Sequence, residues 1–146
     1  MKEFSFVLGG ILLTALLVLA QAGDQARDAF KLGAYSFEVR EKQGDCVLFY
    51  SQKSIKKELK LDVPLPCKAI RRSVKNDVIH HKYNDINAIV FMVGGGLKKG
   101  KCKVETASSY QTVLVKRAHI VLGAKSENST CLPDGPDGKE YWMLSH

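Results

Sequence analysis

Short segments of alternating apolar and polar residues run through most of this chain, and they constrain its fold more than any other feature. In AYSFEVRE (34–41) the apolar positions are Tyr35, Phe37 and Val39, and ELKLDV (58–63) repeats the pattern. A period of two is typical of a β-strand with one buried face. Gly, Pro, Asn and Asp separate the segments. The sequence therefore predicts a mainly β fold, a single small antiparallel β-sandwich or barrel.

The remaining predicted elements follow from the same reasoning. Further strands are expected at CVLFYS (46–51), KAIRRSV (68–74), VIHHKY (78–83), AIVFMV (88–93), KVET (103–106), TVLVK (112–116), AHIVLG (118–123) and YWML (141–144). One short N-terminal helix is expected at DQARDAFKL (24–32), with Asp24 as its N-cap. The predicted core residues are Phe37, Val39, Val47, Phe49, Leu59, Leu61, Ile89, Phe91, Val113, Val115, Ile120 and Trp142.

The N-terminal segment predicts export. After three residues the chain continues as FSFVLGGILLTALLVLAQA (4–22), which is apolar or small-residue and ends in a small-x-small pattern of the kind that signal peptidase cleaves. We expect residues 1–22 to be a cleaved signal peptide and residues 23–146 to form one β-rich domain, periplasmic or secreted. The alternative is an uncleaved anchor, because the run is nearly long enough to cross a bilayer. After cleavage no integral membrane segment is expected.

The cysteines predict two disulfides. All four, Cys46, Cys67, Cys102 and Cys131, follow the signal segment, and an even number in a small exported domain favours disulfides over free thiols. Of the three pairings that four cysteines allow, we favour Cys46–Cys67 and Cys102–Cys131, which close loops of about 20 and about 30 residues. Zinc sites normally use close pairs such as C-x-x-C, which are absent from this sequence. We expect no metal and no cofactor.

The chain is basic, with a net charge of +7. Its basic residues gather in KSIKKELK (53–60), KAIRRSVK (68–75), LKKGKCK (97–103) and VKR (115–117). One interpretation is that these are solvated strand faces. The other is a surface for an acidic partner, such as an acidic protein, an anionic envelope polymer or lipid headgroups. Nucleic acid is not an expected partner, because export removes the usual target and the sequence contains no aromatic-studded recognition motif.

One basic segment also matches the G-x-x-x-x-G-K pattern of a phosphate-binding P-loop, at residues 95–101. A P-loop requires a helix and a Ser or Thr hydroxyl after its lysine, whereas here Cys102 and a strand-like KVET follow. We interpret the segment as a hairpin whose glycines permit positive φ and whose lysines form a cationic tip. The candidate partner-binding residues are Gly95, Gly96, Lys98, Lys99 and Lys101.

No segment predicts a catalytic residue. His80 and His81 are adjacent, so on a strand they point to opposite faces and cannot chelate one metal together. Together with His119 they are the candidates for a small hydrolase. The cysteines are expected to be oxidised, and no serine lies in a G-x-S-x-G or S-x-x-K motif.

The C-terminal stretch CLPDGPDGKEYWMLSH (131–146) combines turn-forming prolines with Asp134, Asp137 and Glu140. Its spacing differs from that of an EF-hand loop, so we expect a tight, disulfide-anchored turn rather than a calcium site. Trp142 is expected to anchor the chain end in the core or at a sheet edge. Asn128 begins an N-x-S/T pattern, which is a glycosylation acceptor if the source is eukaryotic.

The order of CVLFYS, LKLDVPLPC, a Gly-rich turn, a third cysteine and then C-x-P-x-G-x-D-x-K-x-x-W resembles a group of small exported bacterial proteins of no assigned activity. The resemblance covers most of residues 23–146 and consists of turns, cysteines and one tryptophan. It implies a periplasmic, disulfide-bonded β-domain and no particular site. The sequence departs from the pattern at Gly138, where the group has Asp-Glu-Lys and this chain has Asp-Gly-Lys.

These features predict a non-enzymatic exported binding protein. In its most concrete form it is an inhibitor or immunity protein that docks the loop GGGLKKG (94–100) into the acidic cleft of an envelope-targeting lytic enzyme or toxin. One alternative is an envelope-binding module for anionic glycan or lipid. The other is a small periplasmic hydrolase.

Overall fold

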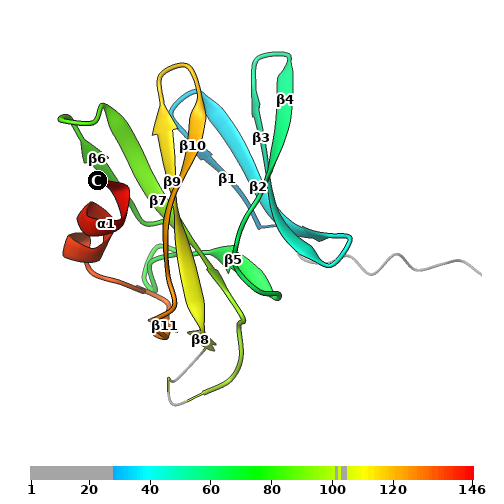
Figure 1. Cartoon of the computed structure of the whole chain (residues 1–146), viewed down its shortest axis with the longest axis vertical. Coiled ribbons are helices and arrows are strands. Elements are labelled where there is room, and N and C mark those ends of the chain that lie inside the picture. The colour runs from blue at the N-terminus through cyan, green and yellow to red at the C-terminus, as the bar shows by residue number, and fades with distance from the viewer. Residues whose placement is uncertain (1–27, 101, 103–104) are drawn as a thin grey trace, which may run out of the picture.

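The computed structural model describes residues 28–100, 102 and 105–146, most of which form short antiparallel strands (Figure 1). The strands are β1 Asp28–Leu32, β2 Tyr35–Lys42, β3 Asp45–Gln52, β4 Ile55–Lys60, β5 Cys67–Ala69, β6 His80–Tyr83, β7 Ala88–Gly95, β8 Glu105–Ala107, β9 Ser109–Lys116, β10 Ile120–Ser126 and β11 Thr130–Leu132. One helix, α1, spans Gly138–Ser145.

Two sheets face each other in a sandwich-like arrangement. The first has the order β1-β2-β3-β4, and the second has the order β10-β9-β7-β5, with β6 also paired to β7. A small third sheet joins β8 to β11. All of these pairings are antiparallel, so the predicted mainly β, antiparallel fold is confirmed.

The main core lies between the two large sheets. Phe37 and Val39 of β2 face Phe91 and Val93 of β7, and all four side chains are buried. The ring of Phe91 lies 5.1 Å from that of Phe37 and 5.2 Å from that of Phe30, centroid to centroid. Offset and edge-to-face rings add to the energy of burial, so this aromatic cluster joins the two sheets.

A second core covers the other face of the second sheet. On this face, on which α1 packs, lie the side chains of Val90 and Met92 of β7 and Leu114 of β9. Tyr141 of α1 is fully buried against them. Because neighbouring strand residues point to opposite faces, β7 contributes alternately to the two cores. The molecule thus has three layers, with α1 on the outside of the second sheet (Figure 1).

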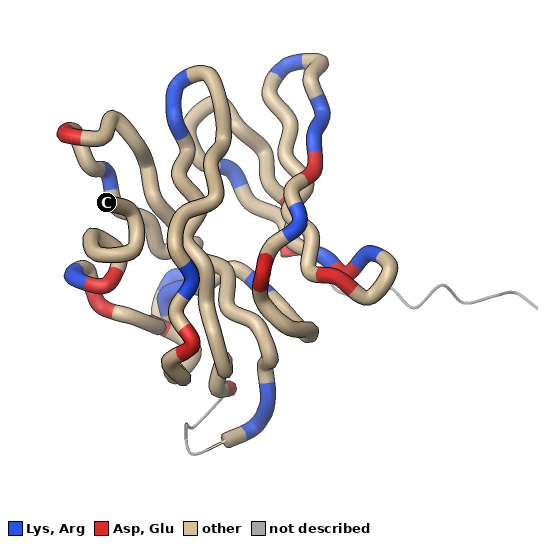
Figure 2. Tube along the Cα trace, viewed as in Figure 1, with Lys and Arg blue, Asp and Glu red and all other residues tan. Residues whose placement is uncertain are grey.

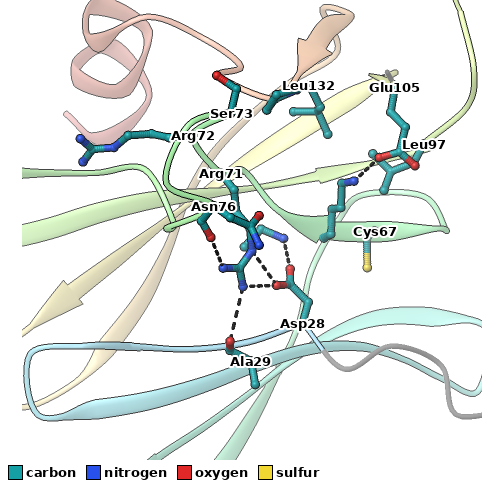
Figure 3. Close-up of a pocket in the computed structure, with 13 residues that line it drawn as sticks. Asp28, Ala29, Cys67, Arg71, Arg72, Ser73, Asn76, Leu97, Glu105 and Leu132 are labelled. Carbon is teal, nitrogen blue, oxygen red and sulfur yellow. Dashed lines mark hydrogen bonds and ion pairs between the residues drawn. The ribbon is translucent and has the colours of Figure 1, made fainter. Parts of the chain in front are cut away.

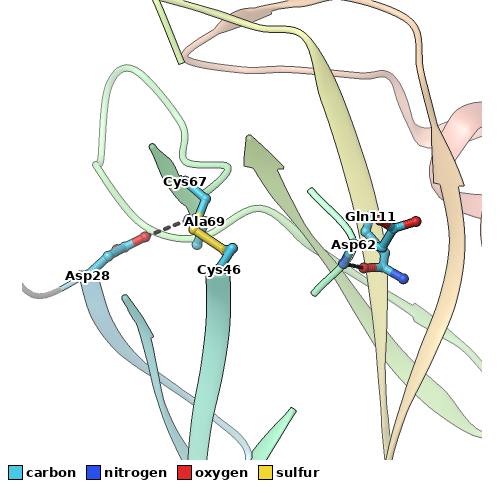
Figure 4. Close-up of a disulfide and its surroundings, with 6 residues drawn as sticks. All are labelled: Asp28, Cys46, Asp62, Cys67, Ala69 and Gln111. Carbon is cyan, nitrogen blue, oxygen red and sulfur yellow. Dashed lines mark hydrogen bonds between the residues drawn. A yellow bond between two sulfur atoms is a disulfide. The ribbon is translucent and has the colours of Figure 1, made fainter. Parts of the chain in front are cut away.

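Both predicted disulfide pairings are confirmed. Cys46 on β3 is bonded to Cys67 on β5, which ties the two large sheets together (Figure 4). Cys102 is bonded to Cys131 on β11. Asp62 adds a further tie, because its backbone N–H donates to Gln111 Oε1 of β9 over 2.8 Å. Two disulfides indicate an oxidising, extracellular compartment.

The predicted signal peptide, residues 1–22, lies outside the described residues. Within the part of the chain that the structure describes, no helix combines the length and the apolar composition needed to cross a membrane.

The prediction of an N-terminal helix is wrong for those of its residues that the structure describes. Residues 24–27 lie outside the described part, and residues 28–32 form β1 instead of a helix. The Asp28 carboxylate accepts a hydrogen bond from Ala69 N over 2.5 Å and pairs with Arg71, while Phe30 stacks on Phe37. These tertiary contacts outweigh the modest helix propensity of DAFKL.

The predicted C-terminal strand at 141–144 is also wrong, because these residues belong to α1. The Asp137 side chain caps the helix by accepting from the backbone N–H groups of Lys139 and Glu140, over 3.0 and 3.1 Å. A helical period buries Tyr141 and leaves Trp142 50% exposed. Trp142 is therefore not the core residue that we expected.

The predicted core face of β3 is inverted. Cys46, Leu48 and Tyr50 point to the second sheet, whereas Phe49 lies half-buried on the outer face with the Arg40 guanidinium 3.7 Å from its ring centroid. Val47 is buried, but on the same outer face as Phe49. Leu59 and Ile89 are partly buried against the core. The other predicted core residues, Phe37, Val39, Leu61, Phe91, Val113, Val115 and Ile120, are buried.

Candidate functional site

The predicted hairpin begins where β7 ends, and residues 96–100 form its first half, which we call the cationic arm. Its base is hydrogen-bonded to the proline-rich segment that precedes β5. Gly96 N donates to Pro64 O over 2.8 Å, and Leu97 N donates to Pro66 O over 3.2 Å. The left-handed φ of +63° at Gly96 is the positive φ that the glycines were expected to provide.

The base of the arm is also fixed to β8. Lys98 N donates to Thr106 O over 3.0 Å, and Thr106 N donates to Lys98 O over 2.8 Å. The Cys102–Cys131 disulfide then attaches the hairpin to β11, the partner of β8. The chain on both sides of the arm is thus held by backbone hydrogen bonds and a covalent bond.

The side chains of two of the predicted partner-binding lysines are exposed to solvent. Lys98 and Lys99 are exposed, and neither forms an ion pair with a described carboxylate. Lys101 lies outside the described residues. Figure 2 shows a basic segment after β7 at the lower end of the molecule. The described arm therefore carries positive charge that is not neutralised by its surroundings.

Gly95 has a structural role at this site. It is buried, and a Cβ added to it would lie 2.6 Å from Val63 Cβ and closer still to the carbonyl oxygen of Pro64. The backbone of β7 can pass the proline segment only because position 95 has no side chain. Gly95 thus positions the arm, and it is not part of the exposed surface of the arm.

We expect Gly95→Ala to lower the free energy of unfolding by about 1–3 kcal/mol, because the added methyl group forces the backbone of residues 63–64 to move. Gly138→Ala is the matched control, since its Cβ would meet only His81 at an ordinary 3.5 Å and helix formation favours alanine. Urea unfolding of both variants measures the difference. Equal stability of the two variants would contradict the close approach at Gly95.

A second group of basic residues gathers at the opposite end of the sandwich. The turns at 33–34, 53–54, 84–87 and 117–119 lie together there, and we call this surface the turn end (Figure 1). The turns and the residues that flank them carry Lys31, Lys53, Lys56, Lys57, Lys82, Lys116 and Arg117. The fold thus brings residues 53–57 and 115–117, parts of two basic segments predicted from sequence, to one end of the molecule and places residues 97–100 of a third segment at the other (Figure 2).

The remaining basic segment, 68–75, lines a groove of about 700 Å³ (Figure 3). The three basic side chains of this segment that line the groove already have partners: Arg71 pairs with Asp28 and also donates to Asn76 O over 2.8 Å, Lys68 pairs with Glu105, and Arg72 pairs with Asp77. Asp28 belongs to the first sheet and Arg71 follows β5 of the second. These contacts hold the sheets together, and they leave this groove with less free charge than either end of the molecule.

The histidines proposed for a hydrolase are not brought together. His80 and His81 lie on β6, while His119 lies in the turn after β9, with β7 and β9 between them in the sheet. His81 contacts Tyr141 with ring centroids 4.6 Å apart, and burial, followed by the charges of His80 and Arg72, lowers its pKa. His81 is therefore part of the contact between α1 and the second sheet.

The C-terminal carboxylates also have separate local partners. Asp134 accepts from Ser73 N and Ser73 Oγ, both over 3.0 Å, and Asp137 caps α1. Glu140 accepts from the Tyr110 hydroxyl over 2.6 Å, and burial, followed by this hydrogen bond, raises the pKa of Tyr110. Within residues 28–100, 102 and 105–146 no group of three His, Cys, Asp or Glu side chains has the arrangement of a metal site.

Sequence reasoning did not include Lys31 and Lys82 in any basic surface, because each is isolated in the sequence. Both flank turns, and the alternation of antiparallel strands sends every second turn to the same end of a sheet. This rule could have identified Lys31 and Lys82 as part of a basic surface at one end of the sheets. Comparisons with known protein families, with curated proteins and with solved structures find no match to this chain.

Proposed function

We propose that this chain is a non-enzymatic exported binding protein whose cationic arm docks against an acidic surface or cleft of a protein partner. In its most concrete form it is an inhibitor or immunity protein that acts on an envelope-targeting lytic enzyme or toxin, in the periplasm or outside the cell. The observation that carries the proposal is the combination of two exposed, unneutralised lysines with a hydrogen-bonded, disulfide-anchored base.

A rigid base matters because binding normally requires a loop to lose conformational freedom. A loop that is already held in place has less entropy to lose when it docks, so more of the contact energy appears as affinity. In the arm, Gly96 and Leu97 are bonded to the proline segment and Lys98 is bonded to β8. These bonds reduce the conformational freedom that the arm loses when it docks.

Charge indicates the kind of partner. Lys98 and Lys99 carry two adjacent positive charges, and Glu105 on β8, the strand bonded to the arm, is already paired with Lys68. Adjacent cations attract an acidic surface and increase the rate of encounter with it. Lytic enzymes whose catalytic carboxylates lie in an open cleft provide such a surface.

Affinity capture tests the proposal directly. The oxidised mature protein is immobilised and exposed to envelope and secreted fractions of its source at moderate salt, and bound proteins are identified by mass spectrometry. We expect one stoichiometric protein with an acidic surface. Recovery of no protein on the wild-type bait, or of the same proteins on bait that carries Lys98→Glu and Lys99→Glu, would refute the proposal.

With a partner in hand, the double change Lys98→Glu and Lys99→Glu is expected to weaken binding by at least about tenfold, because attraction becomes repulsion at the contact. Thermal unfolding should change little, since both side chains are exposed. The control is Lys56→Glu with Lys57→Glu, which changes the net charge equally at the turn end. Equal loss of affinity in both variants, measured by titration calorimetry, would mean that the overall charge and not the arm governs binding.

A further inference from the structure

The turn end has a charge balance unlike the rest of the surface. Seven basic side chains lie on it, and of the acidic residues that the structure describes only Asp85 belongs to these turns and their flanks. Asp85 is engaged elsewhere, because its Oδ2 lies 2.6 Å from His146 Nε2, and this hydrogen bond lowers the pKa of its carboxyl group. The turn end is therefore a concentrated positive surface.

Its basic side chains are also free of internal partners. None of the seven forms an ion pair with a described carboxylate, whereas Lys42, Lys60 and Lys125 elsewhere on the surface all do. All but half-buried Lys116 are exposed. Figure 2 shows basic segments at the tips of both the β3–β4 and the β9–β10 hairpins, so the charges come from both sheets and spread over the whole end.

Two further features accompany this charge. Ile55 follows the β3–β4 turn directly and is 58% exposed, although it is a large apolar residue among Lys53, Lys56 and Lys57. A cleft of about 330 Å³ opens between the sheets, and Lys82, Lys116 and Arg117 contribute to its lining. No carboxylate lines the described cleft, and Gln52 and Asn87 add polar groups to it.

We infer that the turn end docks onto an anionic lipid surface, with phosphate-bearing headgroups as its ligand. A broad array of cations on several hairpins matches an extended anionic plane better than it matches a single small anion. Each Lys or Arg near such a surface contributes attraction. Ile55 enters the region between headgroups, as exposed apolar residues of interfacial segments do. The cleft holds one headgroup, whose phosphate the Arg117 guanidinium can bind in a bidentate manner.

This docking site is separate from the cationic arm, because the two lie at opposite ends of the sandwich (Figure 2). A protein docked on a membrane by its turn end would present the arm away from the bilayer. Binding of the turn end to lipid therefore does not depend on the protein partner proposed above.

Co-sedimentation with vesicles tests it. The oxidised mature protein is mixed with vesicles of phosphatidylcholine alone, or of phosphatidylcholine with one quarter phosphatidylglycerol, at low and at physiological salt. We expect binding only to the anionic vesicles, weakened by salt. Lys56→Gln with Lys57→Gln should lower the partition coefficient by roughly 30-fold. The matched control, Lys98→Gln with Lys99→Gln, removes the same charge from the arm and should leave the partition coefficient nearly unchanged.

Ile55→Ser examines insertion separately from charge. We expect it to lower the partition coefficient by about tenfold at physiological salt, where electrostatic attraction is screened. Absence of binding to anionic vesicles would overturn the inference, as would equal losses in the two lysine variants. Binding to polygalacturonate, an anionic polysaccharide, without binding to vesicles would overturn the assignment to lipid.

Discussion

Phe91→Ala is expected to lower the free energy of unfolding by about 3–5 kcal/mol, whereas Trp142→Ala should cost about 1 kcal/mol or less. Phe91 is fully buried, and its ring contacts the rings of Phe30 and Phe37, so truncation leaves a cavity between the sheets. Trp142 is half exposed on α1, where its ring stacks on His146 with 4.6 Å between centroids.

Urea unfolding of both variants measures this contrast, and an unchanged m-value would show that the comparison concerns the same unfolding transition. The result tests whether the C-terminal residues form a helix with an exposed Trp142. If Trp142→Ala were as costly as Phe91→Ala, the last turn of the chain would be buried as a strand edge, as the sequence pattern alone suggested.

Replacing Cys102 and Cys131 together by serine is expected to cost roughly 3 kcal/mol, because the bond restricts the unfolded chain. Replacing Cys46 and Cys67 should cost about as much, since the sequence separations of 29 and 21 residues differ little on a logarithmic scale. The two variants should differ in partner binding. Only the Cys102–Cys131 bond anchors the hairpin that carries the cationic arm.

Thermal unfolding and partner affinity are therefore measured on both double variants under conditions in which each remains folded. We expect similar losses of stability, with a fall in affinity confined to the variant without Cys102–Cys131. Equal affinities in the two variants would show that the rigid base does not contribute to binding.

The sequence predicts most of the sheet structure, because alternation identifies the buried face of most strands. In β3 consecutive residues are apolar, and there the predicted face is inverted. The sequence also predicts both disulfides, since short loops close most readily. It fails at the first described strand and at the C-terminal helix for a common reason. The segments at 28–32 and 138–145 have weak local preferences, and contacts with distant residues decide their conformation: Asp28 with Ala69 and Arg71, and Tyr141 with the outer face of the second sheet.

The candidate site shows the same division. Basic runs such as LKKGKCK are visible in the sequence, but their spatial arrangement is not. The pairing of strands decides that residues 53–57 and 115–117 meet at the turn end while Lys98 and Lys99 lie at the other. It also decides that Lys68 and Arg71 are paired with carboxylates and the arm lysines are not. Local pattern identifies charge, and the fold determines which charge is available.

Hydrogen exchange of the oxidised protein, alone and with its captured protein partner, tests whether the cationic arm is the docking surface. We expect slower exchange on binding for the amides of residues 97–100, with unchanged exchange at 53–57 and 116–119. The amides at Gly96 and Lys98 should be protected even without partner, because they are hydrogen-bonded at the base of the arm. Protection that appears at the turn end and leaves residues 97–100 unchanged would contradict the docking role of the cationic arm.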